Sequence, residues 1–169
     1  MVKKVTFKQV LNACRAIDRM RKAIRITPDG IPVPVTYGKK FVYGIVKNNG
    51  KMKDDFDGIV ENEKEQYGIE RERVKYCEDH AEKDAAGKPV IETDSTGRER
   101  YKGISEDDPG LKEIFDKKNK AIDAFNAFLK NETEIDLHEI AYEELPEEIA
   151  ILDFEALTIM IGEPKEDKK

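Results

Sequence analysis

The chain of 169 residues contains no tryptophan, only two cysteines, and few aromatic residues, which make up 8% of it. Cys14 and Cys77 alone cannot build the disulfide or Cys-rich metal framework of small stapled proteins, and they fit a reducing compartment. No apolar run approaches the roughly 18 residues of a membrane helix. Charged residues interrupt the first 20 positions, so we expect no secretory signal there. These shortages predict a cytoplasmic protein of about one domain.

Charged residues, in contrast, make up 39% of the chain, against about 25% in an ordinary soluble domain. The net charge of −6 conceals a strong asymmetry. Residues 1–53 hold 13 Lys/Arg and 2 Asp/Glu, a net of +11, so the remainder carries −17. Like charges concentrated on one segment repel unless something compensates them. We therefore expect the basic N-terminal part to lie against the acidic C-terminal part, within one chain or between two copies.

The first 38 residues predict a helix followed by an extended segment. Thr6 and Gln9 have the spacing of a capping box, in which each satisfies the other's free backbone donor. Apolar residues then recur at helical spacing from Val10 to Ile24, which predicts a basic helix within 1–27. Residues 28–38 are rich in proline, which excludes a helix and predicts an extended connector or edge strand.

The rest of the chain predicts a long helical hairpin. We expect a long helix over 39–86, with a break at Asn48–Gly50 left open, and a small β-hairpin over 88–103. Asp108 and Pro109 are a typical start for the amphipathic helix over 108–130. An acidic strand–helix unit follows over 132–162, with Asp153 as the expected helix cap, and 163–169 forms a charged, disordered tail. The prediction is a single, mainly helical α+β domain over 1–162: an N-terminal helix, a long antiparallel helical hairpin with a β tip, and a short C-terminal strand and helix.

Three sets of side chains are candidate interaction surfaces. Each is a run of one chemical character on one predicted element, and so could face a partner instead of solvent or core. The apolar stripe comprises Leu111, Phe115, Ile122, Phe125 and Leu129. The basic face comprises Lys8, Arg15, Arg19 and Lys22. The acidic segment comprises Glu132, Glu134, Asp136, Glu139, Glu143, Glu144, Glu147 and Glu148.

No motif assembles a catalytic or metal site. The stretch from Gly44 to Met52 has five residues between its glycines where a phosphate-binding loop needs four. A calcium loop around Gly58 would place lysines at both obligatory carboxylate positions. Cys77 and His80 share a helix face, but neither an orienting group nor further zinc ligands accompany them. We expect no enzyme activity, no cofactor and no bound metal.

The order of parts resembles an uncharacterised family of short phage and prophage proteins, known as a domain of unknown function and often encoded near tail genes. The resemblance rests on the N-terminal helix beginning at Val5–Thr6, the charged helix running into Glu82–Pro89, the short hairpin to Tyr101–Lys102, the second helix, and Glu132–Leu137. The segment from Pro28 to Pro34 departs from that pattern. The resemblance implies phage origin, and thus the cytoplasm of an infected bacterium, and it carries over no catalytic residues.

These observations lead to one functional hypothesis and two alternatives. The first is a non-enzymatic protein-interaction, structural or assembly factor of phage origin, which acts through its helical faces and charge asymmetry by self-association or on a protein partner. The first alternative is an anti-defence inhibitor whose acidic segment occupies a nucleic-acid groove of the host. The second is direct nucleic-acid binding through the basic face.

Overall fold

The computed structural model describes residues 1–94, 96–105 and 107–164. These residues form a mainly helical α+β fold with small antiparallel strand pairs, which confirms the predicted fold class. They divide into two compact units, residues 1–60 with 128–164 and residues 61–127. The first is called unit 1 and the second unit 2. None of the described helices has the length and apolar character needed to cross a membrane.

Unit 1 is built around helix α1 (Phe7–Lys22) and the antiparallel strands β1 (Val2–Thr6) and β6 (Glu132–Asp136). It also holds a ribbon of β2 (Ile24–Ile26) and β3 (Pro32–Pro34), and the beginning of α2 (Lys39–His80). The short helices η1 (Tyr142–Glu144), α4 (Ile151–Leu157) and η2 (Thr158–Met160) complete it. The largest fully buried side chains of its core include Ile17, Phe41, Met52, Leu137 and Met160.

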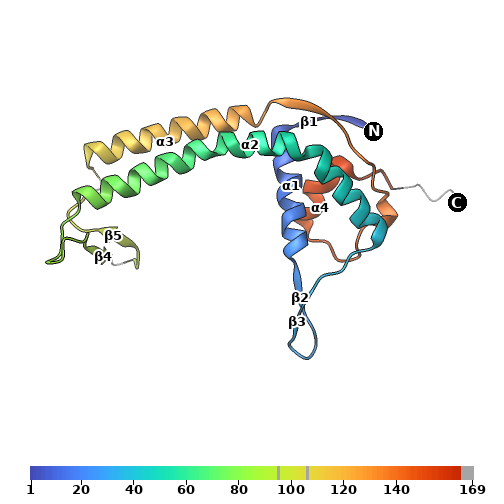
Figure 1. Ribbon diagram of the computed structural model, residues 1–169, viewed down its shortest axis with the longest axis horizontal. Helices are drawn as coiled ribbons and strands as arrows, with labels where there is room; N and C mark the ends of the chain where they lie inside the picture. The colour runs from blue at the N-terminus through green and yellow to red at the C-terminus, as the bar shows by residue number, and fades with distance from the viewer. Residues whose placement is uncertain (95, 106, 165–169) are drawn as a thin grey trace. The chain divides into compact units, whose positions relative to one another are not determined.

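Unit 2 is a helical hairpin with a strand pair in the connection. The later part of α2 runs beside α3 (Pro109–Phe128), and β4 (Ile91–Thr93) pairs with β5 (Glu99–Tyr101) (Figure 1). Its core cluster is small: Ile69, Ile114 and Ala121, with Tyr76 packed against them. The carboxylate of Asp108 accepts hydrogen bonds from the N–H groups of Gly110 and Leu111, as expected for the cap of α3.

Helix α1 begins where the sequence predicts and ends earlier. The Thr6–Gln9 capping box is present. The five residues before the helix form β1, a strand that the prediction for 1–27 did not include. The C-terminal end is Lys22, and Ile24, predicted on the apolar helix face, lies instead in β2 with 64% of its surface exposed. The predicted start after the Thr6 cap is therefore confirmed, whereas the predicted extension to residue 27 was wrong, because Ile24 to Ile26 pair with β3.

Helix α2 runs unbroken through Asn48–Asn49–Gly50 and ends at His80 instead of residue 86. The chain turns after Ala81 because the Asp84 carboxylate accepts hydrogen bonds from the N–H groups of Ala86 and Lys88. Such side-chain turns compete with helical hydrogen bonding. Gly87 completes the turn with φ of +76°, a conformation that favours glycine.

The C-terminal segment also differs in detail from the prediction. Helix α4 is capped by Ala150, and Asp153 lies inside its first turn, so the expected cap at Asp153 was wrong. The Asp153 side chain is instead an acceptor for Arg19 of α1. Of the predicted tail, Glu163 and Pro164 are exposed and lie outside helices and strands, while residues 165–169 lie outside the described residues.

Candidate protein-interaction surface

The basic face of α1 is partly neutralised within unit 1. Arg19 donates two hydrogen bonds to Oδ1 of Asp153, from Nε at 2.9 Å and from a terminal guanidinium nitrogen at 2.6 Å. Lys22 pairs with Asp18 of its own helix at 2.7 Å. Lys8 and Arg15 are exposed. The predicted basic face therefore contributes ion pairs inside the unit as well as solvent-facing charge.

The acidic segment supplies the opposite partners. Glu132 pairs with Lys4, and Glu144 with Lys40 at 3.5 Å. Asp136 accepts hydrogen bonds from the N-terminal amine and from Lys51, and these cations hold the pKa of its carboxyl at about 2. The other members of the segment, Glu134, Glu139, Glu143, Glu147 and Glu148, are exposed. Basic and acidic ends of the chain thus meet within one copy, as the charge asymmetry predicts.

The apolar stripe of α3 is only partly buried. Leu111 and Leu129 are buried, Ile122 and Phe125 are half-buried, and Phe115 is 45% exposed. Two neighbours on the helix, Ile114 and Ala121, enter the core cluster of unit 2 in place of the central stripe residues. Phe115 instead lines an open groove of about 590 Å³ with Leu111, Cys77 and the arginines 73, 98 and 100.

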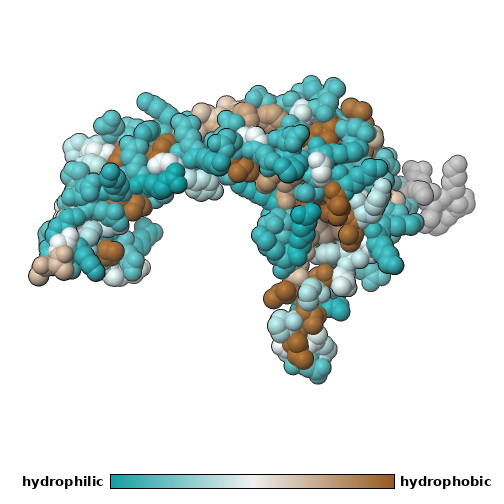
Figure 2. All heavy atoms as spheres, viewed as in Figure 1, coloured by the Kyte–Doolittle hydropathy of each residue, from teal (hydrophilic) through white to brown (hydrophobic). Residues whose placement is uncertain are grey.

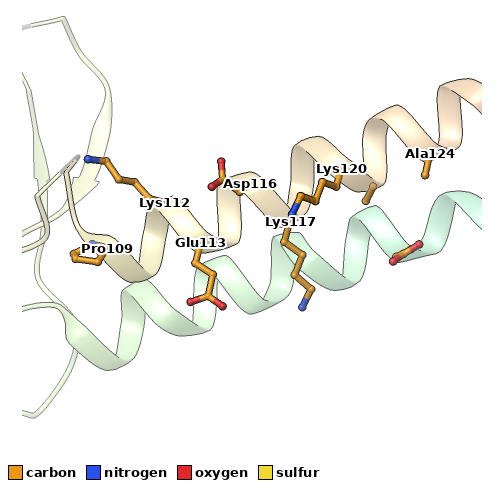
Figure 3. Close-up of a pocket in the computed structure, with 9 residues that line it drawn as sticks. Pro109, Lys112, Glu113, Asp116, Lys117, Lys120 and Ala124 are labelled. Carbon is orange, nitrogen blue, oxygen red and sulfur yellow. The ribbon is translucent and has the colours of Figure 1, made fainter.

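A second open groove of about 730 Å³ follows α3 on unit 2 (Figure 3). Its wall alternates in charge along the helix, with Lys112, Glu113, Asp116 and Lys120 among the side chains that line it. Lys117 lies at the same groove and pairs with Glu72 of α2. A wall on which charges of both signs alternate offers no single class of charged ligand a preferred site.

In the described part of the chain, Cys77 and His80 of α2 share no hydrogen bond, and Cys14 belongs to helix α1. The ring of His80 stacks on Tyr76 at a centroid distance of 4.0 Å, and its Nδ1 lies 2.8 Å from the Tyr76 carbonyl oxygen. Burial raises the pKa of the Cys77 thiol, and it raises the pKa of the Cys14 thiol to about 11. Both cysteines therefore favour the protonated, unreactive thiol over the thiolate. Among the described residues, no three His, Cys, Asp or Glu side chains gather as metal ligands would.

One exposed apolar surface of unit 1 was not predicted from the sequence. It lies on the β2–β3 ribbon, which projects from the end of α1 (Figure 1) and carries hydrophobic side chains at its surface (Figure 2). Ile24, Ile26 and Ile31 are 64%, 63% and 58% exposed. Register places Ile24 opposite Pro34 and Ile26 opposite Pro32. Since alternate residues of a strand share a face, these four side chains form one apolar ribbon face.

The ribbon is held by a defined turn and adjoins further apolar surface. Thr27 accepts a hydrogen bond from the Gly30 N–H at 2.8 Å and donates its own N–H to the Ile31 carbonyl at 3.0 Å, and Gly30 has φ of +78°. At the base of the ribbon, Val35 lines a small groove of about 160 Å³ together with Val42 and Val46 of α2. The alternating prolines in 28–38 indicated an extended connector or edge strand, but no signal in the preceding residues indicated its partner strand, β2.

No protein-family model, curated protein or solved structure matches this chain.

Proposed function

We propose that the protein is a non-enzymatic protein-binding factor that engages its partner through the β2–β3 ribbon of unit 1. The observation that carries the proposal is the apolar ribbon face of Ile24, Ile26, Pro32 and Pro34, on which the two isoleucines are 64% and 63% exposed. Isolated exposed apolar residues are ordinary on a protein surface, whereas a contiguous patch marks an interaction site. Only 38% of the residues of this chain are hydrophobic. The isoleucines on the ribbon therefore come from a small number of residues that could otherwise have been buried in the core.

The charge asymmetry supports the alternatives less well. Glu132, Asp136 and Glu144 of the acidic segment, and Arg19 and Lys22 of the basic face, already have partners inside unit 1. A groove-occupying acidic mimic or a nucleic-acid-binding helix would have to use the charges that remain. The proposal therefore rests on the apolar ribbon. Phage origin, implied by the resemblance stated above, stays a prediction.

Site-specific photo-cross-linking in cells that naturally express the protein tests this proposal. A benzophenone amino acid at position 26 should give a discrete adduct with another protein, identified by mass spectrometry. The same group at Lys64, an exposed position on α2 in unit 2, is the matched control. No adduct from position 26, or the same adducts from both positions, would refute the ribbon as the binding surface.

A further inference from the structure

The two long edges of the β2–β3 ribbon differ in their hydrogen-bonding groups. In an antiparallel pair, residues alternate between positions bonded to the partner strand and positions whose N–H and C=O point outward. Val35 donates to the Ala23 carbonyl and Thr27 to the Ile31 carbonyl, each at 3.0 Å. Between these two bonds the pattern alternates, so Arg25 and Val33 are the hydrogen-bonded pair. The backbone N–H and C=O groups of residues 24 and 26, and the C=O groups of Pro32 and Pro34, point outward.

Proline occupies both outward positions of β3, and isoleucine both outward positions of β2. Proline has no N–H, so the outer edge of β3 lacks donors at residues 32 and 34 and is closed to a further strand. The outer edge of β2, in contrast, presents the N–H and C=O groups of Ile24 and Ile26. Proteins normally blunt such an edge with charges or proline.

The other small ribbon carries more charge. Strands β4 and β5 include Glu92, Glu99 and Arg100, all exposed. Charged side chains on exposed strands disfavour pairing with another chain. The ribbon in unit 1 has isoleucine at both outward positions of β2, whereas the outward positions of β4 are Ile91 and Thr93.

We infer that β2 accepts an added antiparallel strand from a partner protein, an extended segment in which apolar residues alternate with Asp or Glu. This inference rests on the function proposed above. Apolar residues of the added strand would extend the apolar ribbon face, and a carboxylate between them would lie across from Arg25. Oppositely charged pairs directly across a sheet are stabilising, and like charges are destabilising.

Arg25 favours such a segment over a second copy of the ribbon. It is exposed, and although Glu147 and Glu148 line an open groove of unit 1 together with it, none of the described residues forms an ion pair with Arg25. Antiparallel self-pairing centred on β2 would place Arg25 across from its own copy. The neighbouring registers run into Pro28 or into the end of α1 at Lys22.

Nuclear magnetic resonance with the full chain and two synthetic peptides tests the inference. One peptide alternates valine with glutamate and the other valine with lysine, both blocked at their ends. The glutamate peptide should shift the amide resonances of Ile24 and Ile26 in a saturable way, with at least a several-fold smaller response to the lysine peptide. No shift at these amides, or an equal response to both peptides, would overturn the inference.

Three variants sharpen the result. Ile26→Pro should abolish the response, because it removes an outward donor in the way that Pro32 does on β3. Ile26→Val, which keeps the N–H, should respond as the unaltered chain does. Should Ile26→Pro disturb the ribbon itself, as read from the Thr27 and Val35 amides, Arg25→Glu provides an independent test. It should reverse the preference in favour of the lysine peptide, and an unchanged preference would contradict the assigned role of Arg25.

The failures of the two proposals can be told apart. Concentration-dependent shifts of the same amides without peptide, together with a dimer in sedimentation, would assign the edge to a second copy and overturn an acidic partner. A cross-link from position 26 without any peptide response would leave the proposed function standing and refute strand addition. Peptide binding without a cross-link would show that the β2 edge accepts a strand, but it would refute the ribbon as the surface that binds a partner in the cell.

Discussion

Gly44 of helix α2 packs against the chain that follows β6. A Cβ atom at this position would lie 2.6 Å from Cγ1 of Ile140, a side chain that is itself fully buried. Contacts this short do not occur between real carbon atoms, so the core would have to shift. Glycine is therefore required here by packing, although it is a poor helix former.

Replacing Gly44 by alanine should lower the free energy of unfolding by about 1–3 kcal/mol through overpacking, despite the better helix propensity of alanine. Gly50→Ala in the same helix is the matched control, because no heavy atom lies within 4 Å of the position that the added methyl group would occupy. It should raise the free energy of unfolding by up to about 1 kcal/mol. Urea denaturation measures both, and the same sign for the two variants would contradict this account.

Asn48 explains why α2 does not break where the sequence offers Asn-Asn-Gly. Its side chain is fully buried, donates to the His138 carbonyl at 2.8 Å, and accepts from the His138 N–H at 2.6 Å. Both polar ends of the amide are thus satisfied inside unit 1. The sequence does not show whether an asparagine will be buried against a distant backbone group or will end a helix. Whether α2 breaks at Asn48–Gly50 could therefore not be predicted.

At the scale of elements, the turn of the β4–β5 ribbon is organised by Asp94. Its Oδ1 accepts hydrogen bonds from the Thr96 hydroxyl at 2.6 Å, the Thr96 N–H at 2.8 Å and the Arg98 N–H at 3.0 Å. Its Oδ2 lies 3.0 Å from Nε of Arg100. These donors, the Thr96 hydroxyl foremost, lower the pKa of the Asp94 carboxyl to about 2.

The turn should therefore lose order in acid. A carboxyl whose pKa is lowered by folding stabilises the folded form fully above its unfolded pKa of about 3.9 and loses that contribution as the pH falls towards 2. Titration of the Thr96 amide resonance should follow a midpoint near 2. In Asp94→Asn this acid transition should be absent, and a midpoint near 4 in the unaltered chain would refute the hydrogen-bonded turn.

How well each element could be predicted depends on whether its signal is local. The cap at Thr6, the start of α3 at Pro109 and the hairpin around Gly97 all follow from neighbouring residues, and the structure has them. Strand β1 and the strand character of Ile24 depend on pairing with residues farther along the chain. The helical spacing of apolar residues placed Ile24 on the predicted helix, and no local signal indicated its pairing with β3. The ribbon surface was therefore not predicted.

At the scale of the whole molecule, the charge asymmetry cancels in one unit. Unit 1 joins the basic beginning of the chain to its acidic end, and together with residues 165–169 of the sequence it holds 17 Lys/Arg against 18 Asp/Glu, a net of −1. Unit 2 holds 13 against 18, a net of −5. The electrostatic attraction of a partner depends on the net charge of each folded unit, and not on the difference in charge between the two ends of the sequence.

The two units should also differ in local stability. Of the 25 buried hydrophobic residues described, six belong to unit 2, and unit 1 holds the rest. Since burial of apolar surface is the main favourable term in folding, unit 2 has less to oppose its opening. Native-state hydrogen exchange should find amides around Ile114 and Ala121 exchanging faster than those around Ile17 and Leu137. Uniform protection across all four sites would contradict this expectation.

The pairing of β1 with β6 has a consequence for the order in which the chain folds during synthesis. Val2 pairs with Asp136, so the first strand has no partner until more than 130 residues have been made. All residues of unit 2 are made before that strand can be completed. Contacts between such distant parts of a chain form slowly, because a long loop must close first. The helical hairpin can thus form on the ribosome while the beginning of the chain still waits for its partner.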